Sequence, residues 1–333
     1  MRPSVFVLHG LLLLLVAGCR TVPSHAPVPA RAMESLTRYA ESREVFLRRL
    51  SGVEPQVRAA LPRGPVVVPI SLHANTPVIQ ALGPGRQPLR MMLDTGAARL
   101  VMGARSAAKA RVPTVKAGEV QATMIGVVGT EPGLVGMLGP LTIGTWQVPS
   151  WPCFVRTFES HGQGASYPEN ILGFDLAARW CSFLTVDYRS RQSVFGFGLG
   201  YRPRGPRISQ APFHLRDGVA FITLESGGVS WEAVVDTGSF NGIEIDEAIA
   251  KKLGVQDQGQ VVKGLVLMAV GGAVTSDQAR LRSIMLPSLK LLGARYPRAR
   301  VDISPGIPRV GSGFLRDYRV TFDFQQRKLW LEW

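Results

Sequence analysis

Short apolar runs separated by turn residues fill most of the chain. Residues 66–68, 91–93, 221–223 and 233–235 are runs of this kind, with Gly, Pro and Asp between them. This pattern predicts short β-strands joined by tight turns. A helical pattern first returns near residues 246–253. The predicted fold is therefore all-β with short helices.

A different pattern precedes residue 66. From Ala32 to about Leu50, apolar residues recur mostly at intervals of three and four, with Glu and Arg between them, until Gly52 and Pro55 interrupt. This spacing predicts an amphipathic helix in a helical spacer segment, residues 32–61. The helix is either a spacer, a packing element of the main domain or a basic pro-segment over a cleft. The first two roles are favoured.

The N-terminus has the pattern of an export signal. One positive charge, Arg2, precedes an apolar run over residues 11–17 that is too short to span a bilayer. Residues 15–19, Leu-Val-Ala-Gly-Cys, resemble the lipobox of bacterial lipoproteins. The resemblance implies a signal peptide over residues 1–19 and lipidation of Cys19. The alternative is ordinary secretion with cleavage nearby.

The next residues indicate how an exported chain is held. Residues 20–31 are rich in Pro and small polar residues and predict an extended tether. We expect a lipoprotein of the bacterial cell envelope, attached to the membrane through Cys19. Arg20 follows the Cys where inner-membrane retention often uses Asp, which favours the outer membrane.

An internal repeat organises the rest of the chain. Asp94-Thr95-Gly96 recurs as Asp236-Thr237-Gly238, and each follows two apolar residues. Later positions stay in step, since the offset is 142 at these Asp residues, 138 from Gly173 to Gly311 and 136 from Asp187 to Asp323. The punctuated stretch at residues 198–212 divides the two copies. We predict an N-terminal lobe over residues 66–200, a linker over residues 201–212 and a C-terminal lobe over residues 213–333.

Two carboxyls, one from each copy, can hydrolyse a peptide without metal or covalent nucleophile. Held about 3 Å apart they share one proton, so one acts as base toward water and the other as acid. Asp94 and Asp236 are the candidate catalytic pair. Five neighbours are predicted to support the loops: Thr95 and Thr237 through hydrogen bonds across the lobe boundary, Gly96 and Gly238 through tight turns whose amides reach the carboxylates, and Ser239 through a bond to its Asp.

The doubled Asp-Thr-Gly, with an apolar-apolar-Gly segment after each, resembles the aspartic proteases of the pepsin and retropepsin type. The resemblance covers roughly residues 66–333. It implies a bilobed double barrel, a cleft for an extended peptide and a Gly-rich flap, here near residues 127–130. The second closing segment departs from the family, because Arg309 stands where an apolar residue is expected. The flap lacks a nearby Tyr, as retropepsin-like members do.

The predicted activity is aspartic endopeptidase on peptide or protein substrates, by a monomer that holds both lobes in one chain. The alternative is a non-catalytic envelope lipoprotein that uses the same cleft to bind a peptide or protein partner. Two adjacent carboxyls are costly in a mere binding cleft, which disfavours that alternative. No Gly-x-Ser-x-Gly, His-Glu-x-x-His or Walker sequence is present.

The composition of the chain excludes some functions but indicates none. The net charge of +14 comes from scattered basic residues, and no nucleic-acid-binding motif accompanies it. The five His residues stand far apart, so no metal and no cofactor are expected. Once Cys19 is set aside, Cys153 and Cys181 remain, either as a disulfide or as two buried free thiols.

Overall fold

The structure is a computed structural model that describes residues 25–27, 30–120, 122–126, 129–160, 168–264, 266–269 and 272–333. The predicted signal peptide, Cys19 and most of the predicted tether lie outside the described residues. Lipidation of Cys19 stays a prediction, which fatty-acid labelling would test. None of the described helices is long and apolar enough to cross a membrane.

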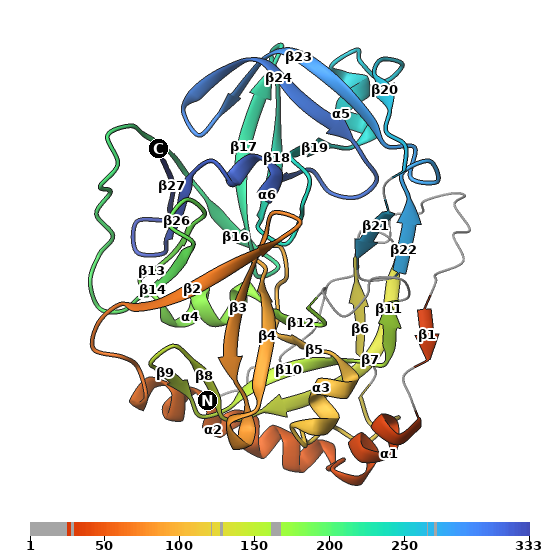
Figure 1. Cartoon of the computed structure of the whole chain (residues 1–333), viewed down its shortest axis with the longest axis vertical. Coiled ribbons are helices and arrows are strands. Elements are labelled where there is room, and N and C mark those ends of the chain that lie inside the picture. The colour runs from red at the N-terminus through yellow and green to blue at the C-terminus, as the bar shows by residue number, and fades with distance from the viewer. Residues whose placement is uncertain are drawn as a thin grey trace, which may run out of the picture.

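Two lobes lie one above the other (Figure 1). The first begins with β2 and ends with β14. Its elements are β2 (Val66–His73), β3 (Thr76–Leu82), η1 (Pro84–Arg86), β4 (Pro88–Leu93), β5 (Val101–Met102), α3 (Ala104–Lys109), β6 (Ala122–Ile125), β7 (Thr130–Leu138), β8 (Leu141–Ile143), β9 (Trp146–Val148), β10 (Trp151–Arg156), β11 (Phe158–Ser160), β12 (Asn170–Leu172), α4 (Phe174–Trp180), β13 (Phe183–Asp187) and β14 (Gln192–Gly196).

The second lobe repeats this plan. Its elements are β15 (Ile208–Pro212), β16 (His214–Arg216), β17 (Val219–Ser226), β18 (Val229–Asp236), β19 (Ile243–Ile245), α5 (Glu247–Lys252), β20 (Gln260–Val261), β21 (Val266–Ala269), β22 (Gly272–Thr275), β23 (Arg282–Leu291), β24 (Ala294–Ile303), β25 (Arg309–Gly311), α6 (Ser312–Leu315), β26 (Arg319–Asp323) and β27 (Lys328–Glu332). Strands β17-β18-β25-β19-β24-β23 close into a barrel, because β17 also pairs with β23. The order β3-β4-β12-β5-β10-β7 in the first lobe is the same arrangement.

The lobes are joined by a shared sheet in the order β15-β27-β26-β13-β14-β2, here called the inter-lobe sheet. At its centre β13 pairs with β26, and Thr185 lies opposite Thr321 with their hydroxyl oxygens 2.8 Å apart. Asp187 and Asp323 end these two strands and cap equivalent turns by accepting backbone N–H bonds. Residues 136 positions apart in the sequence are therefore related by a local two-fold axis between β13 and β26.

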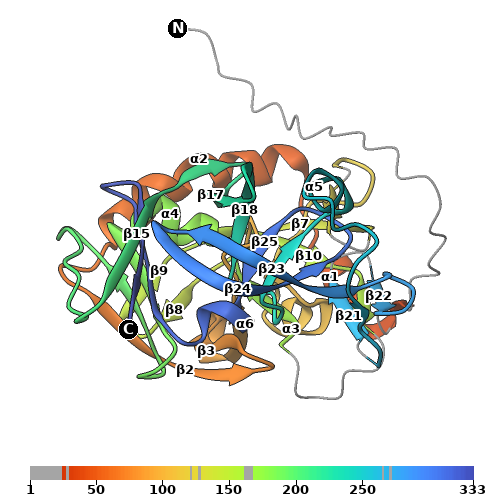
Figure 2. The same cartoon turned by 90° about the horizontal axis from the view of Figure 1, so that it is seen from above.

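The inter-lobe sheet lies at one end of the molecule, and the β6–β7 and β21–β22 hairpins lie at the other (Figure 1, Figure 2). Each lobe contributes one hairpin, β6–β7 below and β21–β22 above (Figure 1). The predicted flap thus falls on the β6–β7 turn, where Gly126 donates its N–H to the Gly129 carbonyl at 2.8 Å. Residues 127 and 128 lie outside the described residues.

The last five residues of the predicted linker, residues 208–212, form strand β15. Strand β15 forms the edge of the inter-lobe sheet by pairing with β27. Before it, the buried carboxylate of Glu332 accepts hydrogen bonds from the Tyr201 hydroxyl and from the Arg204 and Gly205 N–H groups. The Pro- and Gly-rich sequence indicates where the chain passes from one lobe to the other. It does not show that the chain then pairs with β27.

In the described part of the chain, three elements precede the first lobe: β1 (His25–Pro27), which pairs with β11, α1 (Ala30–Arg38) and α2 (Arg43–Ala59). Both helices pack on the outer face of the first lobe, away from the second (Figure 1). Contrary to expectation, α2 continues through Gly52 and Pro55. Val53 and Val57 are buried in the core, and this burial offsets the unfavourable helix propensity of Gly and Pro. Of the roles considered, packing on the domain is the observed one.

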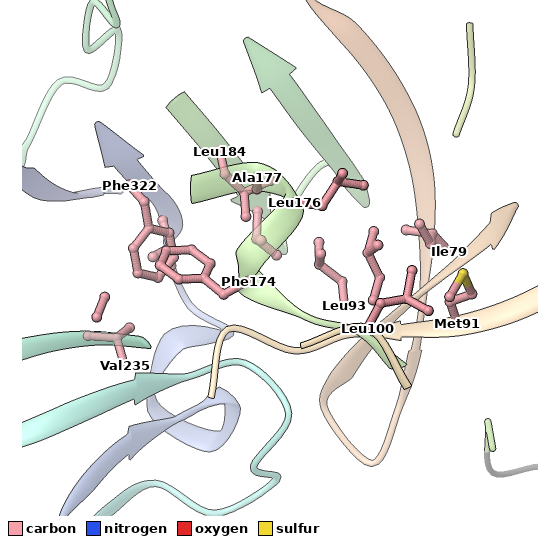
Figure 3. Close-up of a cluster of buried hydrophobic side chains, with 14 of the residues drawn as sticks. Ile79, Met91, Leu93, Leu100, Phe174, Leu176, Ala177, Leu184, Val235 and Phe322 are labelled. Carbon is pink, nitrogen blue, oxygen red and sulfur yellow. The ribbon is translucent and has the colours of Figure 1, made fainter. Parts of the chain in front are cut away.

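A continuous hydrophobic core lies behind the lobe junction. Phe174 of α4 packs edge-on against Phe322 of β26, with ring centroids 4.9 Å apart (Figure 3). Leu93 and Val235, the last residues before Asp94 and Asp236, are 1% and 0% exposed in the same cluster. Fully packed side chains directly behind the two Asp residues restrict their movement.

The two cysteines in the described residues are buried and free, so the predicted disulfide between them is wrong. Cys153 lies on β10 and Cys181 follows α4. Burial raises the pKa of the Cys153 thiol to about 12 and also raises the pKa of Cys181. Both thiols therefore stay protonated and behave as small apolar core residues.

Candidate active site

The two Asp-Thr-Gly loops meet where the lobes join. Asp94 follows β4, and Asp236 is the last residue of β18. Each of these strands has a parallel neighbour from the closing segment of its own lobe: Leu172 of β12 lies opposite Leu93, and Gly311 of β25 lies opposite Asp236. The sequence repeat thus becomes a repeated loop geometry.

The threonines interlock the loops. Thr95 N–H donates to Thr237 Oγ1 at 3.0 Å, and Thr237 N–H donates to Thr95 Oγ1 at 3.0 Å. Each hydroxyl donates onward to the opposite lobe, Thr95 to the Val235 carbonyl and Thr237 to the Leu93 carbonyl, both at 2.6 Å. Both threonines are 0% exposed. The predicted hydrogen bonds across the lobe boundary are confirmed.

Replacing Thr95 and Thr237 together with Val should lower the melting temperature strongly. Two backbone N–H groups and two carbonyls then lose these partners in a buried site, at about 1–3 kcal/mol each. The matched control is Thr185→Val with Thr321→Val, a buried pair whose hydroxyls bond only each other among the described contacts. That control should lower the melting temperature much less, because both hydrogen-bond partners are removed together. Equal losses for the two doubles would contradict an interlock.

The glycines make room for the opposite aspartate. A Cβ on Gly96 would lie 2.5 Å from Asp236 Cγ, and a Cβ on Gly238 would lie 2.3 Å from Asp94 Cγ. Their amides also reach their own carboxylates as predicted: Gly96 N–H donates to Asp94 Oδ1 at 2.8 Å and Gly238 N–H to Asp236 Oδ1 at 2.9 Å. Each Gly therefore brings the two carboxyls together and orients one of them.

The next residue in each loop adds a second amide. Ala97 N–H donates to Asp94 Oδ1 at 3.1 Å and Ser239 N–H to Asp236 Oδ1 at 3.0 Å. The predicted bond from the Ser239 hydroxyl to its Asp is wrong. That hydroxyl donates instead to Oε2 of Glu244, at 3.3 Å, because this buried carboxylate lies beside the loop.

The environments of the two carboxyls differ. Burial, and then the charge of Asp236, raise the pKa of Asp94 well above its usual range. Burial also raises the pKa of Asp236, but the nearby Arg309 guanidinium and a hydrogen bond from Asp94 oppose that rise. These causes favour the proton on Asp94 over Asp236 when the pair holds a single proton.

Sequence reasoning missed one residue of the site. Glu244 is 2% exposed and lies on β19 beside the Asp236 loop, where it forms an ion pair with Arg309 at 3.2 Å. Arg309 was recognised as a departure from the family but was given no role. The available signal was a charged residue between Ile243 and Ile245, in a strand otherwise apolar.

A buried hydroxyl chain supports the second loop from behind. Ser312 Oγ donates to the Thr237 carbonyl at 2.7 Å and lies 2.7 Å from the Tyr188 hydroxyl oxygen. Ser312 is 0% exposed, which agrees with its interpretation as part of the closing segment rather than as a nucleophile. Within the described ranges, no group of three or more His, Cys, Asp or Glu side chains is arranged to hold a metal.

A bilobed, mostly β chain with two Asp-Thr-Gly loops face to face between its lobes has the fold of the aspartic proteases. The profile of the family described as Aspartyl protease matches residues 81–176. That segment runs from β3 to α4 and contains Asp94, the β6–β7 hairpin and the closing segment of the first lobe. No curated protein matches the chain. The family match indicates a peptidase domain.

Proposed function

We propose that this chain is an aspartic endopeptidase that hydrolyses peptide bonds with a water activated between Asp94 and Asp236. The observation that carries the proposal is the pair itself. Two loops from opposite lobes interlock through Thr95 and Thr237, and each Gly packs against the opposite Asp. Placing two carboxyls together in a buried site is energetically unfavourable, and shared-proton catalysis is one of the few functions that require it.

The unequal environments of the two carboxyls support the following roles. Charged Asp236 takes a proton from water as the water oxygen bonds to the scissile carbonyl carbon, while Asp94 gives its proton to the carbonyl oxygen. The tetrahedral intermediate then breaks at its C–N bond. Asp236 passes its proton to the leaving nitrogen, and Asp94 recovers a proton from the hydroxyl that becomes the new carbonyl. The pair returns to its starting state with one proton.

Both carboxyls come from one chain, so the proposed enzyme acts as a monomer. The substrate is a peptide or unfolded protein segment bound in extended form between the lobes, with the β6–β7 and β21–β22 hairpins at the same end of the molecule (Figure 1). An extended segment exposes its backbone carbonyl to both carboxyls, whereas a helical segment holds that carbonyl in its own hydrogen bonds.

The test is cleavage of a mixed peptide library by the full-length protein, from acid to neutral pH, in heavy-oxygen water. We expect each new carboxylate to carry one heavy oxygen. Added hydroxylamine should yield no hydroxamate, because the proposed route forms no acyl-enzyme. Hydroxamate products would indicate a covalent nucleophile instead, and a library left intact at every pH would overturn the proposal.

A further inference from the structure

The two halves of the site differ at one pair of equivalent positions. In the first lobe Ile171 lies opposite Met92 on one side and Val101 on the other. In the second lobe Arg309 lies opposite Val234 and Glu244 in the same way. An apolar pair beside Asp94 is therefore replaced by an ion pair beside Asp236.

The first-lobe pair, Val101 and Ile171, is apolar and buried. Met92, Val101 and Ile171 form a small apolar cluster at 4%, 4% and 8% exposure, and Ala97 packs against it. Asp94 therefore has apolar side chains at the two described positions that are equivalent to Arg309 and Glu244. This environment disfavours its charged form.

The second-lobe pair is buried but charged. The side chains of Arg309 and Glu244 are 10% and 3% exposed, with Arg309 Nε 3.2 Å from Glu244 Oε2. Glu244 Oε1 also accepts a hydrogen bond from Asn241 Nδ2 at 3.0 Å, and Ser239, the equivalent of Ala97, donates to Oε2. The Glu244 carboxylate is therefore held from two sides by the loop that carries Asp236.

Arg309 reaches the catalytic pair as well. Its Nη1 lies 4.0 Å from Asp236 Oδ2, and no described residue accepts a hydrogen bond from its buried Nη2. A guanidinium cannot lose its charge at any working pH. The cation therefore favours a negative charge on Asp236, and it is not among the main influences on the pKa of Asp94.

Other ionisable groups around the pair do not reverse this asymmetry. Asp302 of β24 lies opposite Glu244, and burial raises its pKa. Tyr188 lies behind both Asp residues, and burial raises the pKa of its phenol, so it stays neutral. Among the described residues, Arg309 is the cation that forms an ion pair with Asp236.

We propose that Arg309 and Glu244 are a positioning pair that makes the site unequal, so that Asp236 is the charged member and Asp94 the protonated one. The positive charge of Arg309 stabilises the negative charge on Asp236. Glu244 holds the Arg309 guanidinium in place and balances its charge inside the second lobe. This inference rests on the proposed function and adds the device that assigns its acid and base.

Two variants test the pair with shifts of opposite sign. Glu244→Val with Arg309→Ile installs the first-lobe residues, and such an apolar swap of a buried ion pair usually folds. Loss of the cation makes the first ionisation of the pair harder, so the acid limb of the kcat/KM profile should move to higher pH by about half a unit to one unit. Glu244→Gln keeps the shape but removes a negative charge, so the limb should move to lower pH.

Ile171→Val is the control, because it loosens the equivalent first-lobe contact without changing a charge. It should alter rates without moving the acid limb. A merely structural role for Arg309 and Glu244 would likewise change rates or melting temperature, but it would not produce opposite pH shifts. Unshifted profiles in both folded variants would overturn the positioning proposal.

A second readout does not depend on proteolysis. The side-chain carboxyl carbons of Asp, isotopically labelled in the full-length protein and assigned with Asp94→Asn and Asp236→Asn, report the titration of each carboxyl by NMR. Asp236 should ionise first in the wild type, and the order should become closer to equal in the double variant. If the wild type cleaves nothing but titrates in this order, the endopeptidase proposal fails and the pair's role survives. If the double variant titrates like the wild type, the pair's role is wrong whatever the activity.

Discussion

Replacing Asp94 or Asp236 with Asn should reduce peptide cleavage by roughly a thousandfold or more, because acid and base act through one shared proton. Asn keeps the shape of Asp and can still accept the loop amides, such as Gly96 N–H at 2.8 Å. The expected loss is therefore chemical rather than structural. The measurement is kcat/KM on a peptide that the wild type cuts.

The same variants should gain stability at neutral pH. Burial raises the pKa of both carboxyls above their unfolded values, so their protonated forms favour folding at acid pH. That contribution is lost as pH rises through the folded pKa values. An Asn has no proton to lose, so the melting temperatures of variant and wild type should agree in acid and diverge toward neutral pH, with the variant higher.

Asp246→Asn is the matched control. Asp246 caps α5 by accepting the Ile249 N–H at 2.8 Å, and Asn caps helices equally well. This variant should cut like the wild type. Retained cleavage in Asp94→Asn or Asp236→Asn would place the chemistry elsewhere, and unfolding of either variant would show that the pair is structural.

Gly238→Ala should also abolish most activity, although it changes no ionisable group. The added methyl would lie 2.3 Å from Asp94 Cγ, so one of the loops must move. A displacement of about 1 Å between reacting groups costs on the order of a hundredfold in rate, and overpacking a closed site costs about 1–3 kcal/mol of stability. Gly96→Ala should behave similarly against Asp236.

The control for this prediction is Gly64→Ala, where an added Cβ meets no heavy atom within 4 Å. It should leave both rate and melting temperature nearly unchanged. A fully active Gly238→Ala would show that the loops have room to spare, so that the close approach of the two carboxyls is not imposed by packing.

Arg309 illustrates why a departure from a family pattern is informative. In the sequence it only weakened the match of the second closing segment. In the structure it lies between Glu244 and Asp236, at 3.2 and 4.0 Å. The strand register that places Arg309 opposite Glu244 cannot be read from either residue, because they are far apart in the chain and their pairing depends on the closed barrel.

The sequence alone was enough to predict the all-β, two-lobed fold with short helices, the meeting of Asp94 with Asp236 and the bonds between Thr95 and Thr237. These features follow from a repeated local pattern: two copies of one turn, in step along the chain, fold alike and meet at a two-fold axis. Three features could be seen only in the tertiary structure. The Ser239 hydroxyl donates to Glu244 rather than to Asp236, residues 208–212 form a strand, and Cys153 and Cys181 are free thiols. Each of these depends on which distant strand lies alongside and on what it buries. Long-range packing sets both, and local sequence does not encode them residue by residue.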